Sequence, residues 1–228
     1  MNNQQISSVD LDTNTLLVHS IFLTIQGEGP FSGQPATFLR LAGCNLQCPE
    51  CDTEYTKGAT RMNYTDIAHD ISEVTRRGGL VVISGGEPFR QNILPIIYLL
   101  MSSGYRVQVE TNGTLPPHGK LLTDITIVCS PKTGSVNKDL IPYISAYKYV
   151  LTAGEVDWED GLPISVLGHS VHKRVARPHE GFTGPVYVQP ADNGNSFDNA
   201  LNLNAAVKSS MTFGHTLQLQ IHKIIGVE

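Results

Sequence analysis

Residues 36–53 read ATFLRLAGCNLQCPECDT, and this stretch joins an apolar strand directly to a loop that holds three cysteines. The first part, Ala36–Leu41, has the apolar and β-branched content that is typical of a strand. Gly43 then opens a loop in which residues 44, 48 and 51 are cysteine. The stretch therefore predicts that three thiols lie together at the carboxyl end of a strand.

Strands and helices alternate along the rest of the chain. The expected strands are Leu80–Ser84, Arg106–Thr111, Ile125–Cys129, Tyr147–Leu151, Val186–Gln189 and Leu217–Ile221, and the expected helices are Tyr64–Arg77, with Thr65 as its N-cap, Ile93–Ser103 and Asn199–Ser209. This alternation predicts an α/β fold with a mainly parallel sheet and helices outside it, either open or curled into a partial (β/α) barrel. Residues 1–16 are polar and are expected to form a flexible N-terminal arm before a single domain over residues 17–228. Residues 154–183 show no clear pattern.

Composition limits the classes of function. The chain has 228 residues, of which 40% are hydrophobic, and a formal net charge of -5. It has neither a run near the roughly 20 apolar residues of a membrane span nor a basic cluster, so we expect no membrane and no nucleic-acid partner. The N-terminus lacks the parts of a secretory signal, which favours the cytoplasm. In that reducing compartment, cysteines this closely spaced indicate a metal site rather than disulfides.

Polar and glycine-rich segments follow the expected strands. In chain order they are GCNLQCPECDT, SGGEP, ETNGT, CSPK and QPAD. Because the carboxyl ends of parallel strands meet at one edge of a sheet, these segments are expected to surround one site.

The cysteine spacing favours a four-iron cluster over zinc. Cys44, Cys48 and Cys51 are separated by three and two residues, so one loop can direct three thiolates at three corners of a 4Fe–4S cluster. The fourth iron is then left for an exogenous ligand such as S-adenosylmethionine (SAM). A structural zinc site needs a fourth protein ligand. Cys129 could supply it, or it could be a small buried hydrophobe.

Ser84-Gly85-Gly86-Glu87-Pro88 has glycines that allow the backbone to approach a ligand closely. Alone it is equally compatible with an ordinary turn between a strand and a helix. Together with the cysteine loop, GGEP resembles the segment on which radical SAM enzymes bind the methionine amine.

More narrowly, the chain resembles the 7-carboxy-7-deazaguanine synthases, radical SAM enzymes of the queuosine and deazapurine pathways. The resemblance extends from about Ile21 to the C-terminus, and the segments that carry it are FLTIQGEGPFSGQPATFLRLAGCNLQCPECDT, ISGGEP, VETNGT, SPK, VQP and QIHKIIGV. IQGEG before the cysteine loop and CDT after it are its most specific parts.

The resemblance implies a reaction and its cofactors. A 5′-deoxyadenosyl radical, formed from SAM at a 4Fe–4S cluster, would initiate conversion of 6-carboxy-5,6,7,8-tetrahydropterin to 7-carboxy-7-deazaguanine with loss of ammonia. Mg²⁺, a flavodoxin-like electron donor and a homodimer are also implied. The cofactor carries the radical, so no side chain is assigned a catalytic role.

The resemblance also assigns site residues by position. Substrate contacts fall on Ile25, Gln26, Gly27, Arg40, Ser84 and the terminal Glu228; SAM contacts fall on Glu50, Cys51, Asp52, Gly86, Ser130, Pro131, Lys132, Gln189, Pro190, Ala191 and Asp192; the Mg²⁺ ligand is Thr53. An arginine fork suits a carboxylate, although a strand arginine also pairs commonly with a neighbouring acid. A hydroxyl suits Mg²⁺, although a threonine also caps turns.

The chain departs from the family pattern at Glu50, where an aromatic residue usually precedes the last cysteine. A carboxylate there puts nucleotide affinity and cluster potential in question. Two other functions stay open on the sequence: a radical SAM activating enzyme that places a glycyl radical on a partner protein, and a zinc-bound module without catalysis.

Overall fold

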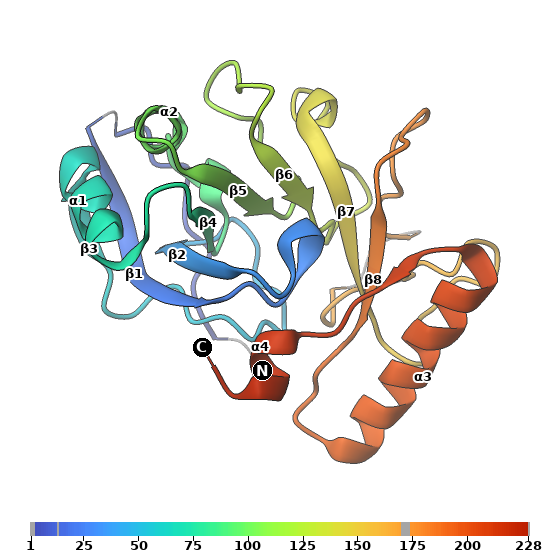
Figure 1. The fold of residues 1–228 in the computed structure, drawn as a ribbon. Coiled ribbons are helices and arrows are strands. Elements are labelled where there is room, and N and C mark those ends of the chain that lie inside the picture. The colour runs from blue at the N-terminus through green and yellow to red at the C-terminus, as the bar shows by residue number, and fades with distance from the viewer. Residues whose placement is uncertain (1–2, 13, 170–173, 228) are drawn as a thin grey trace.

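The computed structural model describes residues 3–12, 14–169 and 174–227, and one sheet runs through this part of the chain (Figure 1). Its strands are β1 (Thr15–Ile25), β2 (Pro35–Leu41), β3 (Thr60–Asn63), β4 (Leu80–Gly85), β5 (Arg106–Thr111), β6 (Thr126–Cys129), β7 (Ile144–Leu151), β8 (Val186–Pro190) and β9 (Thr216–Leu217). The α-helices are α1 (Tyr64–Val74), α2 (Leu94–Ser102), α3 (Ser196–Phe213) and α4 (Ile221–Ile225). Three short 3-10 helices, Gly29–Phe31, Pro88–Arg90 and Ile141–Tyr143, lie in the connections.

The strand order is β3-β1-β2-β4-β5-β6-β7-β8-β9. From β2 to β9 all neighbouring strands are parallel, and β1 and β3 add an antiparallel edge. The expected α/β fold with a mainly parallel sheet is confirmed. Because β3 and β9 end the sheet without pairing to each other, it stays open as a partial barrel (Figure 1).

Several local predictions are corrected. The sequence did not predict β1 or β3, and a strand over Leu217–Ile221 is wrong, since β9 ends at Leu217 and α4 begins at Ile221. The N-cap of α1 is Asn63 rather than Thr65, because the side chain of Asn63 accepts the N–H of Asp66 at 2.8 Å. The hydroxyl of Thr65 is used in a bond to Asn63 instead.

The two faces of the sheet differ in chemistry. Along β5, Val107 and Val109 belong to the hydrophobic core that α1 and α2 cover, whereas Gln108 and Glu110 point to the opposite face. Successive side chains alternate between faces, so each strand can supply both an apolar core and a polar interior. On β6, Cys129 belongs to the apolar core and is fully buried, which confirms the interpretation of this thiol as a small hydrophobe.

The described part of the segment before β1, for which the composition favours a flexible arm, makes backbone contacts with the core. The N–H of Ser7 donates to Cys44 O at 2.7 Å, and that of Asp10 to Arg90 O at 2.8 Å. Arg90 in turn donates to Ser8 O at 2.7 Å. Composition alone does not reveal such backbone bonds, which depend on where the core offers free carbonyls.

The described residues 154–169 and 174–183 are irregular and are connected by ion pairs. Arg177 contacts Asp160 at 2.7 Å and Asp157 at 3.2 Å, and Arg174 lies 3.3 Å from Asp157. Leu167 among these residues has a φ of 51°, and its carbonyl accepts the N–H of Glu50 at 3.1 Å. These residues therefore support the cysteine loop from one side.

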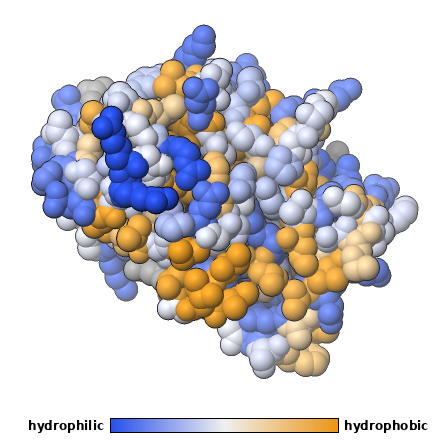
Figure 2. Space-filling model, viewed as in Figure 1, coloured by the Kyte–Doolittle hydropathy of each residue, from blue (hydrophilic) through white to orange (hydrophobic). Residues whose placement is uncertain are grey.

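The C-terminal helix α4 lies on the surface with much of its apolar side exposed. Figure 2 shows apolar side chains gathered where α4 lies in Figure 1; Ile224 is 67% exposed and Ile225 53%. Polar contacts attach α4 instead, including the N–H of Ile221 donating to Gly27 O at 3.4 Å. No helix in the described part of the chain has the length and apolar character needed to cross a membrane.

Candidate active site

A cavity lies at the carboxyl ends of the parallel strands, where the sequence places the polar segments. Most of the predicted site residues line it, namely Ile25, Gln26, Arg40, Cys44, Cys48, Glu50, Cys51, Asp52, Thr53, Ser84, Gly86, Ser130, Lys132, Gln189, Pro190 and Asp192. Gly27, Pro131 and Ala191 are not in its lining. Glu228 lies outside the described residues. The structure therefore gathers residues from positions 25 to 192 around one space.

The three loop cysteines form no disulfide and face this cavity, and Cys44 and Cys48 are each 7% exposed. Burial raises the pKa of Cys44 to about 12 and that of Cys48 to about 11, and it also raises the pKa of Cys51. The positive charge of Lys132 lowers the pKa of Cys48 and Cys51 in part. Because cysteine binds metal as a thiolate, metal binding at this loop has to displace the protons that burial retains.

The GGEP segment packs directly on the cysteine loop. A Cβ atom built on Gly86 would lie 2.1 Å from Gly43 O, and one built on Gly85 would lie 2.1 Å from Leu41 O. The N–H of Gly86 donates to Leu41 O at 3.2 Å, and that of Glu87 to Gly43 O at 3.0 Å. The glycines are therefore required because two strand-end loops touch through their backbones.

Glu87 forms hydrogen bonds with the loop that follows β5. It is fully buried and accepts the hydroxyl of Thr111 at 2.8 Å and the N–H of Asn112 at 2.7 Å. Burial raises the pKa of Glu87 despite these bonds. Asn112 donates to Asn45 Oδ1 at 3.0 Å, so ETNGT, GGEP and the cysteine loop form one bonded unit.

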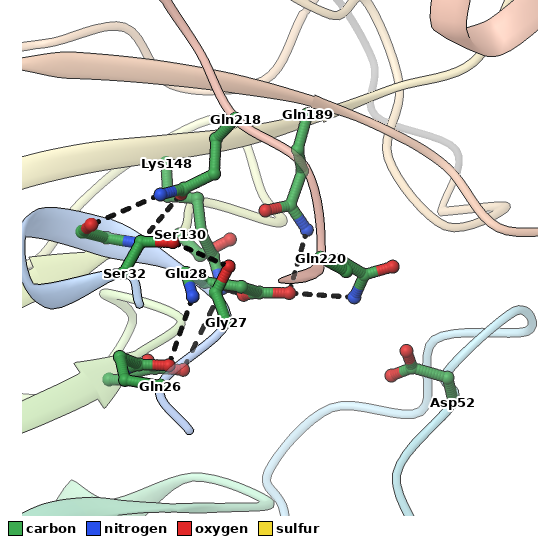
Figure 3. Close-up of polar contacts among 12 residues, drawn as sticks. Gln26, Gly27, Glu28, Ser32, Asp52, Ser130, Lys148, Gln189, Gln218 and Gln220 are labelled. Atoms are coloured by element: carbon green, nitrogen blue, oxygen red, sulfur yellow. Dashed lines mark hydrogen bonds and ion pairs between the residues drawn. The ribbon is translucent and has the colours of Figure 1, made fainter. Parts of the chain in front are cut away.

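The inner face of the sheet carries a buried ionic network (Figure 3). Glu28 of IQGEG pairs with Lys148 on β7 and accepts from Gln189 at 3.1 Å and Gln220 at 2.7 Å. Burial opposes ionisation of Glu28, yet the Lys148 ammonium and these donors hold its pKa at about 2. Lys148 also lies 3.7 Å from Glu110, so the cavity interior holds one ammonium between two carboxylates.

Arg40 and Ser84 lie side by side at the cavity wall, because they are partners in the parallel pairing of β2 with β4. The guanidinium of Arg40 lies 4.8 Å from the ring centroid of Phe22, which stacks on Phe38 at 5.5 Å. A guanidinium stacked on an aromatic face directs its N–H groups outward in the plane of the group. The arrangement suits recognition of an anionic group.

Two further contacts organise the cavity rim. Lys132 donates to Ser130 O at 2.8 Å, and burial lowers its pKa. Lys223 on α4 lies 2.9 Å from Asp52 and 3.1 Å from Asp192, so it joins the cysteine loop to the segment after β8. The C-terminal helix thus connects strand ends that are far apart in the sheet.

Some lining residues were not identified from the sequence. They include Phe22, Glu28, Glu110, Lys148, Gln220 and His222. Four of them belong to the segments IQGEG, VETNGT and QIHK, which the sequence singled out without assigning those side chains. Phe22 opens the segment FLTIQGEG, which carries the resemblance without assigning this side chain, whereas Lys148 occupies an ordinary strand without any motif and had no signal in the sequence.

Fold and site together define a class. A partial barrel that opens on three cysteines with spacings of three and two residues is the arrangement of a radical SAM enzyme. The crystal structure of QueE from Escherichia coli has the same fold, with a TM-score of 0.69 at 21% identity, over 90% of this chain and 94% of that one. No protein-family model matches the chain.

Sequence relatives give the family. The 7-carboxy-7-deazaguanine synthase of Rhodospirillum rubrum is 42% identical over 225 residues, which cover 95% of this chain and 94% of that protein. The protein of the same name from Rickettsia prowazekii is 37% identical over 237 residues, with 99% and 94% covered. The chain belongs to the 7-carboxy-7-deazaguanine synthase family, which implies a 4Fe–4S cluster and SAM.

The residues present fit those two groups. Three thiols facing one cavity supply three corners of a cluster and leave one iron open. Gln189 is 3% exposed, and its Oε1 has no hydrogen-bond partner among the described residues, so the cavity wall offers a buried acceptor to a bound molecule. A single ion such as zinc needs ligands around one point. The described residues contain no such group of three or more His, Cys, Asp or Glu.

Proposed function

We propose that this chain converts 6-carboxy-5,6,7,8-tetrahydropterin to 7-carboxy-7-deazaguanine with loss of ammonia, as a radical SAM lyase. The observation that carries the proposal is that the three-cysteine loop shares one cavity with Arg40, Ser84 and Gln26, the positions that the family uses for its substrate. The identity of 42% over 95% of the chain supports the same activity.

Cys44, Cys48 and Cys51 would hold the cluster, with SAM against Gly86 and Gln189. When bound, the cluster and SAM together supply a 5′-deoxyadenosyl radical that abstracts a hydrogen atom from the substrate. Around them, the chain limits the access of water with Leu167 and with Gln220 and His222 at α4, which line the cavity. Keeping water out protects a reactive intermediate and strengthens electrostatic contacts inside the site.

Binding and orientation of the pterin fall to the inner face of the sheet. Arg40 meets the carboxylate of the substrate through its guanidinium edge. The carboxyl groups of Glu28 and Glu110 lie beside Lys148 and suit the N–H groups of a pterin ring as acceptors. Fixing the ring between these groups sets the distance between the reacting hydrogen and the radical.

Thr53 supplies a hydroxyl oxygen for Mg²⁺, which accepts such a ligand together with waters and substrate oxygens. A flavodoxin-like protein delivers the electron, and the chain works as a cytoplasmic homodimer. These points follow from the family resemblance.

The test is anaerobic incubation of the reconstituted protein with SAM, dithionite, Mg²⁺ and the carboxypterin. We expect a deazaguanine acid that depends on all four components. The Cys48→Ala variant should make none, whereas Cys129→Ala, which changes a core thiol, should keep the activity. SAM cleavage without pterin turnover would reject the proposal, and a glycyl radical on a partner protein would favour an activating enzyme.

A further inference from the structure

Gln4, which lies far from the cysteine loop in sequence, forms hydrogen bonds with the end of this loop. Gln4 Nε2 donates to Thr53 O at 2.8 Å, and Gln4 Oε1 accepts the N–H of Tyr55 at 2.7 Å. Both atoms of one side-chain amide are thus bonded to backbone groups two residues apart. A residue before β1 therefore pairs with the end of the loop much as a neighbouring strand would.

Other contacts align Gln4 with the loop. The N–H of Ser7 donates to Cys44 O at 2.7 Å, and Ile6 forms a bridge with Cys44. At the base of the loop, Gly43 N donates to Tyr55 O at 2.8 Å. The segment that carries Gln4 is therefore bonded to the start of the loop, while Gln4 itself is bonded to its end.

The position of these bonds matters for the third cysteine. Cys51 Sγ lies 3.8 Å from Thr53 O, the same carbonyl that Gln4 Nε2 contacts. As a thiol, Cys51 donates to this oxygen. The carbonyl of Thr53 is therefore the point at which the third cysteine of the loop and the side chain of Gln4 meet. By holding this carbonyl, Gln4 fixes the backbone that directs Cys51.

We propose that Gln4 is a positioning residue for the cluster loop, which fixes Thr53 O and Tyr55 N so that Cys51 and Thr53 stay at the cavity wall. The proposal rests on the proposed function, since it presumes an iron–sulfur cluster on these cysteines. Tyr55 is 1% exposed, so its backbone N–H has little access to water if Gln4 is removed. Removing the hydrogen-bond partner of a buried N–H costs more free energy than removing that of an exposed N–H.

The test compares Gln4→Ala and Gln4→Glu with Gln5→Ala, a matched change at an exposed neighbour. Amide hydrogen exchange at Tyr55, measured on the full chain without cluster, reports the bond directly. On reconstituted protein, the rate of iron loss to a chelator and the EPR spectrum of the reduced cluster report loop geometry. Global unfolding is measured alongside, to separate these readouts from overall stability.

For Gln4→Ala we expect exchange at Tyr55 and iron loss to be each roughly tenfold faster, which corresponds to about 1.4 kcal/mol, with a changed EPR spectrum. Gln4→Glu should keep slow exchange at Tyr55 because a carboxylate still accepts that N–H, yet lose iron faster because it cannot donate to Thr53. Gln5→Ala should match the wild type. Equal effects of Gln4→Ala and Gln5→Ala, or wild-type exchange and iron loss in Gln4→Ala, would overturn the proposal.

These readouts are separate from turnover. A wild-type protein that binds a cluster but does not convert the pterin removes the proposed function and leaves the role of Gln4 testable by exchange. Conversely, an active wild type with an unaffected Gln4→Ala variant removes only the positioning role.

Discussion

Replacing Gly86 by alanine should separate the two loops that build the cluster end of the cavity. The new Cβ would lie 2.1 Å from Gly43 O, 2.5 Å from Gly43 C and 2.9 Å from Cys44 Cβ. The favourable separation between non-bonded heavy atoms is roughly 3.5–4.0 Å. Two of the three atoms are backbone, so no side-chain rotation can relieve the overlap. Gly86, unlike Gly85 at +126°, has no left-handed φ, so the expected strain is steric.

The magnitude follows from what must move. Overpacking a tight contact costs about 1–3 kcal/mol. Moving the loops apart also weakens the bonds from Gly86 N to Leu41 O and from Glu87 N to Gly43 O, each worth roughly 0.5–1.5 kcal/mol. A total near 3 kcal/mol should lower the unfolding midpoint of a chain of this length by about 6–12 °C.

The assay is thermal unfolding of the Gly86→Ala protein without cluster, followed by its iron content after reconstitution. Gly134→Ala is the matched control, because a Cβ there would meet only Arg174 O, at 3.5 Å. We expect Gly134→Ala to resemble the wild type and Gly86→Ala to lose both stability and iron. If the two variants share one unfolding midpoint and one iron content, the close backbone contact does not have the role argued here.

Three further variants test other parts of the site. Glu28→Gln should make stability depend less on pH. The pKa of Glu28 is held at about 2 beside Lys148, so its carboxylate contributes stability that is complete above pH 4.5 and lost between about pH 4.5 and 2. Acid unfolding that is unchanged in the variant would contradict this. Lys223→Met should cost less than about 1 kcal/mol, and less still at high salt, because its ion pairs are partly exposed; a large loss of unfolding free energy that salt does not affect would show that another contact is involved. Cys129→Ala should retain the iron content that Cys48→Ala loses, and iron loss in both would make Cys129 a ligand.

The sequence was sufficient for the fold class and for most of the cavity lining. Continuous apolar strands alternating with amphipathic helices predict a parallel sheet, and parallel strands align their carboxyl ends. Motifs that follow these strands, such as GGEP and QPAD, therefore had to meet at one edge. That inference needs only local patterns and the handedness of the connections.

Elements with weak local signals were less predictable. Burial alternates regularly along β1 only from Thr15 to Val18, so its strand pattern is weak. The segment at Leu217–Ile221 is apolar enough for a strand although most of it is not one. Short apolar runs do not distinguish strand from helix by periodicity. Which one forms depends on the neighbour that the chain meets, which here is the loop at Gly27 and Gly29.

The sequence by itself determined that three cysteines follow a strand and that a GGEP segment follows the next parallel strand, because spacing and pattern are local properties. Only the tertiary structure decided that Lys148 pairs with Glu28 across 120 residues and that Gln4 holds the end of the cysteine loop. Such partners are selected by proximity in the folded chain, where burial makes an unpaired charge or N–H costly. No local sequence pattern encodes which distant residue pairs with such a charge or N–H.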